Sequence, residues 1–116
     1  MTNAITRDHI LKALTGVAYT VVTKENLAAL SKEYRHAFVD ECAPGDLVWS
    51  CPRGIRGEEG VVVVRFRDGW LIRAMLFRAG HDDYQGLVTI RDGLLVLLAE
   101  KPAGDVYNLV TGRRVT

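Results

Sequence analysis

The chain has 116 residues, of which 48% are hydrophobic and 25% are charged, a composition typical of globular domains and unlike that of disordered chains. Fifteen Lys and Arg residues stand against 14 Asp and Glu residues, so the formal net charge is +1, whereas a dedicated nucleic-acid binder normally has a basic excess. No apolar run reaches the roughly 20 residues of a membrane span, and the N-terminus lacks the pattern of a signal peptide. We therefore expect a single cytoplasmic domain over residues 1–116 with no membrane partner.

The stretch after Thr6 predicts a first helix. Apolar residues from Ile10 to Val22 recur at steps of three and four, the period of one helical face, and Thr6 can cap the helix. Gly16 is followed by a run of β-branched and aromatic residues, which suits a strand. Two interpretations follow: one helix over 7–22, or a helix that ends at Gly16 with a short strand after it. We favour the single helix, because the spacing continues through Gly16.

A second helix is predicted to begin after Thr23, which can cap it, with Glu25 in the first turn. The sequence Pro44-Gly45 stops any continuation. The apolar face of this helix consists of Leu27, Leu30, Tyr34 and Phe38. We expect the two helices to form a hairpin whose apolar faces cover one side of a sheet.

From Asp46 onward the pattern changes to short apolar segments separated by turn signals, which predict strands. Arg-Asp-Gly occurs twice between such segments, at 67–69 and 91–93, and is a strong hairpin signal. A last small hairpin is predicted around Thr111-Gly112. The predicted fold class is therefore α+β, with two N-terminal helices packed on an antiparallel sheet of about five strands built from hairpins.

The register of the first hairpin can be predicted by sorting its two faces. A three-residue turn with Gly69 in the left-handed conformation pairs Phe66 with Trp70 on a wholly apolar face. The same turn brings Arg65 and Arg73 together on the other face. A two-residue turn, in contrast, would put Arg73 among apolar residues. We therefore predict the three-residue turn, and the same turn in the second hairpin.

Signals for metal binding and catalysis are weak. Cys42 and Cys51 lie nine positions apart, whereas zinc ligands usually come in close pairs, so we expect reduced, metal-free cysteines and no cofactor. The stretch His81-Asp82-Asp83-Tyr84 joins an imidazole to two carboxylates and could shuttle protons. It falls in a link between hairpins, however, where polar residues belong in any case. The common nucleophile, metalloprotease and phosphate-loop motifs do not occur, and no catalytic residue is predicted.

Residues 51–78 contain six arginines, no lysine and three acidic residues. The planar fork of arginine binds carboxylates, phosphates and aromatic faces at interfaces. Arg53 and Arg56 lie among glycines, so guanidinium forks and backbone N–H groups can converge there on a phosphate or a carboxylate. The alternative is a solvated face with local ion pairs. Because the net charge is near zero, an acidic protein surface is a better match than nucleic acid.

Two helices with one apolar stripe each can cover one sheet face and leave the other bare, and bare apolar faces are uncommon on soluble monomers. An apolar patch rimmed by arginine is typical of a protein interface. The sequence therefore predicts a small non-enzymatic protein-interaction module that forms a homodimer and binds another protein. The predicted partner-binding residues are Arg53, Arg56, Arg65, Leu71, Arg73, Met75 and Phe77.

Two alternatives stay open. A helix pair followed by a curved sheet can enclose a pocket for ligand binding or simple acid–base catalysis, provided that polar groups of Tyr19, Asp46, His81 or Asp83 converge in it; this is an analogy of fold. The Arg53–Arg78 segment can also bind nucleic acid, in which case affinity should fall steeply with added salt.

Overall fold

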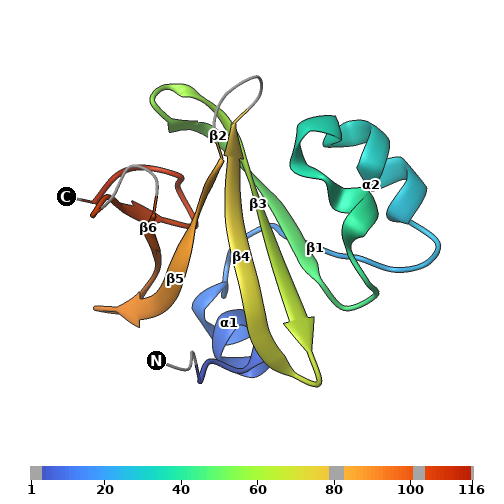
Figure 1. Ribbon diagram of the computed structural model, residues 1–116, viewed down its shortest axis with the longest axis horizontal. Coiled ribbons are helices and arrows are strands. Elements are labelled where there is room, and N and C mark those ends of the chain that lie inside the picture. Colours follow the sequence, from blue (N-terminus) through green and yellow to red (C-terminus); the bar gives the residue numbers. More distant parts are fainter. Residues whose placement is uncertain (1–3, 79–82, 101–103, 116) are drawn as a thin grey trace.

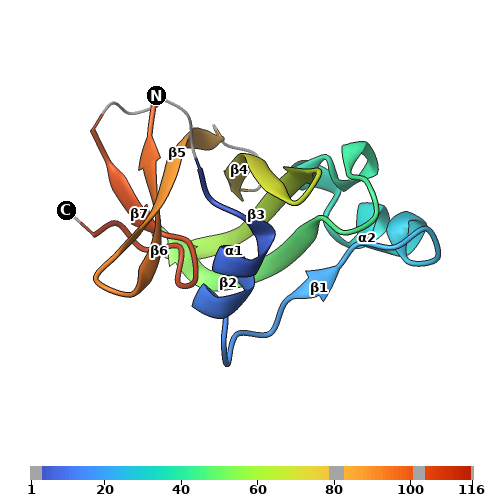
Figure 2. The same ribbon diagram turned by 90° about the horizontal axis from the view of Figure 1, so that it is seen from below.

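The computed structural model describes residues 4–78, 83–100 and 104–115, and its main feature is a curled antiparallel meander (Figure 1). Within these ranges seven strands lie side by side in chain order. They are β1 (Thr20–Val21), β2 (Leu47–Ile55), β3 (Glu58–Arg67), β4 (Trp70–Arg78), β5 (Tyr84–Arg91), β6 (Leu94–Ala99) and β7 (Val106–Asn108). The predicted antiparallel sheet with α+β content is confirmed, but it has seven strands rather than about five. The sheet curls so that β5–β7 turn away from the plane of β2–β4 (Figure 2).

The first helix is shorter than predicted. Helix α1 runs from Arg7 to Ala13, and the Thr6 side chain accepts a hydrogen bond from the His9 N–H at 3.2 Å, as a helix cap does. The favoured helix over 7–22 is wrong, and the alternative with a strand is closer. Gly16 has a positive φ of 83°, and Thr20 then pairs with Val48 in the sheet. The β-branched run takes part in the sheet, because it gains ladder hydrogen bonds and cross-strand contacts there.

The second helix is also shorter than predicted. Helix α2 (Leu27–Glu33) is followed by two 3-10 turns, η1 (Arg35–Ala37) and η2 (Val39–Glu41). Between the two turns Phe38 has a left-handed backbone with φ of 52°, which interrupts any regular helix. Its ring is half exposed and lies 5.8 Å from the Phe77 ring, centroid to centroid. No helix in the described ranges is both long and apolar enough to cross a membrane.

The two helices cover opposite faces of the sheet, which corrects the prediction that both lie on one side. Successive side chains of a strand point to alternate faces. Along β3, Val62 and Val64 belong to the core that contains Ile10 and Leu14 of the α1 region. The alternate residues of β3, Val61 and Val63, belong to a second core. This core also contains Leu30 of α2 and Val39 of η2. In Figure 1, α1 and α2 accordingly lie on either side of the β3–β4 hairpin.

The β3–β4 hairpin has a two-residue turn, so the predicted pair of Phe66 and Trp70 is wrong. Asp68 and Gly69 both have positive φ, 52° and 81°, and Phe66 lies opposite Leu71. Such a turn matches the natural twist of paired strands. The register then shifts by one residue at Ile72. Beyond this shift, Val64 lies opposite Ala74 on one face of the hairpin, and Arg65 lies on the other face. Arg65 lies opposite Arg73, so the two arginines share a face, as predicted, although through a different register.

The left-handed glycine at this turn generates a stability prediction. A Cβ at Gly69 would meet no atom within 4 Å, so only the backbone conformation restricts the residue there. Gly69→Val should lower the free energy of unfolding by about 1 kcal/mol or more, because a β-branched residue tolerates positive φ poorly. Urea unfolding followed by circular dichroism measures the change. Asp68→Asn is the control and should leave stability nearly unchanged, because asparagine also adopts positive φ.

Candidate functional site

A cleft of about 440 Å³ opens between the β2–β3 turn and the segment after β7. Among the residues that the structure describes, its lining contains four arginines and no acidic residue; these lining residues are Arg53, Gly54, Arg56, Gly57, Tyr107, Arg113 and Arg114. All four arginine side chains are exposed. Of the residues that the sequence indicated as a possible anion site, Arg53 in β2 and Arg56 in the β2–β3 turn lie on one wall of this cleft. The arginines of the second wall, at 113 and 114, were missed.

Close backbone contact holds the two walls together, and glycine makes it possible. A Cβ at Gly54 would lie 2.5 Å from the carbonyl oxygen of Thr111. A Cβ at Gly112 would lie 3.0 Å from the Cα of Gly54. Real Cβ contacts are almost never so short, so the β2 loop and the C-terminal turn approach this closely only because both positions are glycine. The backbone segments that carry Arg53 and Arg113 are thereby held close to each other.

Buried hydrogen bonds reinforce this junction. The Trp49 indole N–H donates to the Leu109 carbonyl oxygen at 2.6 Å, and Trp49 is 1% exposed. The Cys51 thiol lies 3.3 Å from the Val110 carbonyl oxygen. The Asn108 side-chain oxygen accepts from the Val110 N–H at 2.8 Å and shapes the following turn. Trp49 thus anchors the C-terminal segment to β2.

Arg56 occupies a position where its residue type is unusual. Three two-residue turns of this chain have positive φ at both positions: Arg56-Gly57, Asp68-Gly69 and Asp92-Gly93. The two other turns place aspartate first, which tolerates the left-handed region because its short side chain bonds locally. Arginine lacks that compensation and costs about 1 kcal/mol there. The turn chemistry therefore does not explain Arg56, and the position of its guanidinium at the cleft offers a reason.

Arg53 also has a left-handed backbone, with φ of 59°. It lies in an irregular part of β2, where three residues between Cys51 and Ile55 lie opposite a single residue of β3. Such a bulge bends a strand and re-aims its side chains, and bulges occur often next to binding sites. Both arginines of this wall therefore sit on backbone that is strained for their residue type, and both line the cleft.

The positive charge in the cleft is mostly uncompensated. Arg114 pairs with Asp105, Nη1 to Oδ1, at 3.8 Å. Within the described ranges, Arg53, Arg56 and Arg113 form no ion pair. Tyr107 contributes no negative charge, because burial and its hydrogen bond with Tyr84 raise the pKa of its hydroxyl. The arrangement is therefore suited to binding an anion through guanidinium forks.

Comparison of the chain with models of known protein families, with curated protein sequences and with solved structures finds no match.

The apolar residues predicted for the interface lie elsewhere. Leu71 is 5% exposed in the core on the α1 side, and Phe77 is 0% exposed in the core on the α2 side. Met75 is partly buried against the second core. Because α1 and α2 cover opposite faces, these residues do not form the exposed patch expected from the sequence, and the bare sheet face that motivated it is absent from the region of β2–β4.

Of the four remaining arginines of the segment, Arg67 is exposed and the other three have local partners. Arg73 Nη2 donates to Gln85 Oε1 at 2.6 Å, and Arg78 Nε lies 3.6 Å from a Glu58 carboxylate oxygen. Arg65 Nε lies 3.5 Å from Asp46 Oδ2. For these three the solvated, locally paired interpretation is the correct one. Only Arg53 and Arg56 of the predicted arginines line the cleft.

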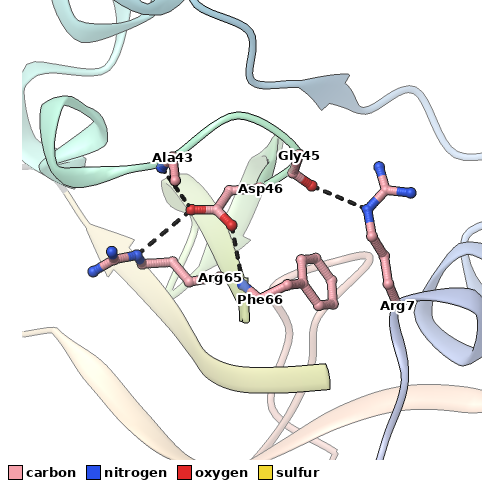
Figure 3. Close-up of polar contacts among 6 residues, drawn as sticks. All are labelled: Arg7, Ala43, Gly45, Asp46, Arg65 and Phe66. Atoms are coloured by element: carbon pink, nitrogen blue, oxygen red, sulfur yellow. Dashed lines mark hydrogen bonds and ion pairs between the residues drawn. The ribbon is translucent and has the colours of Figure 1, made fainter. Parts of the chain in front are cut away.

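Asp46 is the buried partner in this set, with an exposed fraction of 2%. Its Oδ2 accepts a hydrogen bond from the Ala43 N–H at 2.9 Å, and its Oδ1 accepts one from the Phe66 N–H at 3.0 Å (Figure 3). With the Arg65 contact, both carboxylate oxygens have partners from two different elements. Beside it, Arg7 Nε donates to the Gly45 carbonyl oxygen at 3.1 Å. The role of Asp46 is therefore structural.

Of the polar groups of the alternative enclosed pocket, Tyr19 and Asp46 are not brought together. Tyr19 lines an open hollow beside Tyr34 and Pro52, whereas Asp46 is enclosed by its own partners. His81 and Asp82 lie outside the described residues. The thiols of Cys42 and Cys51 are free and buried, and burial raises the pKa of each to about 11. In the described part of the chain no cluster of three potential metal ligands occurs.

Replacing the buried carboxylate tests its structural role. Asp46→Asn should lower the free energy of unfolding by about 2–4 kcal/mol, because an amide presents an N–H group to one of the donors and leaves Arg65 without its anion. Asp40→Asn, at an exposed position in the neighbouring turn η2, is the matched control and should change stability by less than about 0.5 kcal/mol. Urea denaturation of the three proteins gives the comparison. Equal stability of both variants would contradict the role of Asp46.

Proposed function

We propose that the protein is a small non-enzymatic binding module that takes an acidic segment of another protein into the arginine-lined cleft. The observation that carries this proposal is the convergence of Arg53, Arg56, Arg113 and Arg114 on one cleft whose described lining contains no acidic residue. Two of them are held there at unfavourable backbone angles. Such strain persists where the surrounding structure imposes it, and it is typical of ligand-binding positions.

The composition of the lining favours binding over catalysis. Arginine stays protonated in proteins and acts as a donor of up to five hydrogen bonds rather than as a base. Tyr107 is 3% exposed, and its hydroxyl is kept neutral by its raised pKa. Glycine supplies only backbone. These groups can orient and neutralise an anion, which supports a binding role.

The distribution of arginine favours a protein segment over nucleic acid. A nucleic-acid track needs a continuous basic surface, often with exposed aromatic rings on which bases stack. Here Arg65, Arg73 and Arg78 have local partners. Arg53, Arg56 and Arg113, which form no ion pair within the described ranges, line the cleft, and Tyr107, the aromatic residue of its described lining, is buried.

Substitution of Arg56 can test peptide binding without loss of stability, because arginine is an unfavourable residue at this turn position. Arg56→Asp gives this turn the chemistry of the turns at 68 and 92, so stability should stay equal or rise by up to about 1 kcal/mol. Binding of a fluorescein-labelled oligoglutamate peptide, measured by fluorescence anisotropy at low salt, should weaken by about tenfold or more. Stability is read from urea unfolding of the same samples.

Arg67→Asp is the matched control, because Arg67 is exposed on β3 and does not line the cleft. It makes the same change in net charge and should weaken binding by less than about threefold. Equal losses for both variants would show that only net charge matters and would overturn the assignment of the cleft.

Self-association is a second part of the proposal, and the exposed leucines of β5 and β6 give it a place. Leu87 and Leu98 are direct cross-strand neighbours, 45% and 37% exposed. Leu94, 43% exposed, is on the same face of β6 as Leu98 because the two are four residues apart. A second copy of the chain can cover such a stripe through a two-fold axis.

Sedimentation velocity at tens of micromolar tests the dimer. The unsubstituted protein should sediment as a dimer, and Leu98→Glu should raise the dimer dissociation constant by about tenfold or more, because it buries an unpaired charge. Val21→Glu is the control, because Val21 is equally exposed at 37% on the far strand β1. A monomeric unsubstituted protein, or equal effects of the two variants, would remove this part of the proposal.

A further inference from the structure

The charge on the cleft exceeds what one carboxylate can balance. Four guanidinium groups line it, and within the described ranges only Arg114 has an ion-pair partner, Asp105. Three positive charges therefore remain around a volume of about 440 Å³. A carboxylate brings one negative charge and two oxygens. A phosphate monoester brings between about 1.5 and 2 negative charges near neutral pH, with three acceptor oxygens.

The arginines also approach from two sides. Arg53 comes from the irregular part of β2 between the pairs Cys51–Gly60 and Ile55–Glu58, and Arg56 comes from the β2–β3 turn that the second pair closes. Arg113 and Arg114 come from the segment after β7, which the bridge between Tyr107 and Arg114 ties to that strand. A planar carboxylate offers both oxygens in one plane and suits a single fork. The oxygens of a tetrahedral phosphate can be bound by forks from both walls at once.

We infer that the anionic group held in the cleft is a phosphate monoester on a side chain of the partner's acidic segment. The inference rests on the proposed function, since it names the group that such a segment presents. The phosphate lies between the two walls, where Arg53 and Arg56 donate from one side and Arg113 from the other. Arg114 keeps Asp105 as its partner when the cleft is empty and adds a donor when the phosphate is bound.

The inference separates the four arginines by role. Removing a fork from either wall should reduce the preference for phosphate, because each wall supplies part of the coordination. Removing the Asp105 carboxylate, in contrast, should raise affinity for the phosphate, because this carboxylate competes with the phosphate for the Arg114 guanidinium. Asp105→Asn makes this change and retains the backbone carbonyl that accepts from the Ala99 N–H at 2.7 Å.

The test uses four short fluorescein-labelled peptides that share flanking glutamates and differ at the centre. The centre is phosphoserine, serine, one glutamate, or two adjacent glutamates that match the phosphate's charge. Fluorescence anisotropy at constant ionic strength should show that the phosphoserine peptide binds about tenfold more tightly than the two-glutamate peptide. Arg53→Gln and Arg113→Gln should each abolish most of this difference, whereas Arg67→Gln should leave it intact. Asp105→Asn should strengthen phosphopeptide binding severalfold.

The outcomes distinguish this inference from the proposal on which it rests. If the two-glutamate and phosphoserine peptides bind equally well through the cleft, the phosphate inference is overturned and the acidic-segment proposal stands. If none of the four peptides binds, both are overturned. Competition with inorganic phosphate identifies the source of the group. Inorganic phosphate that binds as tightly as the phosphopeptide would show that no partner segment is recognised and would also overturn the inference.

Discussion

A single buried carboxylate joins the helical part of the chain to the sheet. Asp46 stands at the entry to β2 and accepts hydrogen bonds from the Ala43 N–H behind it and from the Phe66 N–H at the far end of β3. Its own carbonyl oxygen accepts from the Val22 N–H, which follows β1. Arg65 supplies the compensating charge. Burying a carboxylate without such partners would be strongly unfavourable, so these segments must arrive together for Asp46 to be accommodated.

This attachment decides which surfaces remain for binding. Because α2, η1 and η2 follow β1 and lead directly to Asp46, they cover one face of β2–β4, while α1 covers the other. Both faces of β3 are therefore covered: Val61 and Val62 point to opposite faces, and both are 0% exposed. The broad faces of this part of the sheet are thus used in folding. Recognition is left to the end of the sheet, where loops meet, and to the exposed stripe on β5 and β6.

Local signals in the sequence were predictive, and non-local ones were not. The Thr6 cap and the left-handed Gly69 follow from a few neighbouring residues, and the structure contains both. The bulge at Ile72 was missed because the prediction assigned side chains to the two faces of the hairpin on the assumption of regular pairing. One extra residue in β4 gives the same assignment of faces with a two-residue turn. The second wall of the cleft was missed because only the curl of the whole sheet brings Arg113 to the β2 loop.

The order of the strands bears on how the cleft comes into being. Each strand pairs with its neighbour in the chain, so most of the sheet can form through short loop closures, which are entropically cheap and fast. The hydrogen bond from Trp49 to Leu109 spans 60 residues and closes one of the longest loops in the molecule. The cleft beside it therefore exists only in chains that have folded to the end. An anion that binds there acts on the native state alone, and the whole meander shares the stabilisation that it provides.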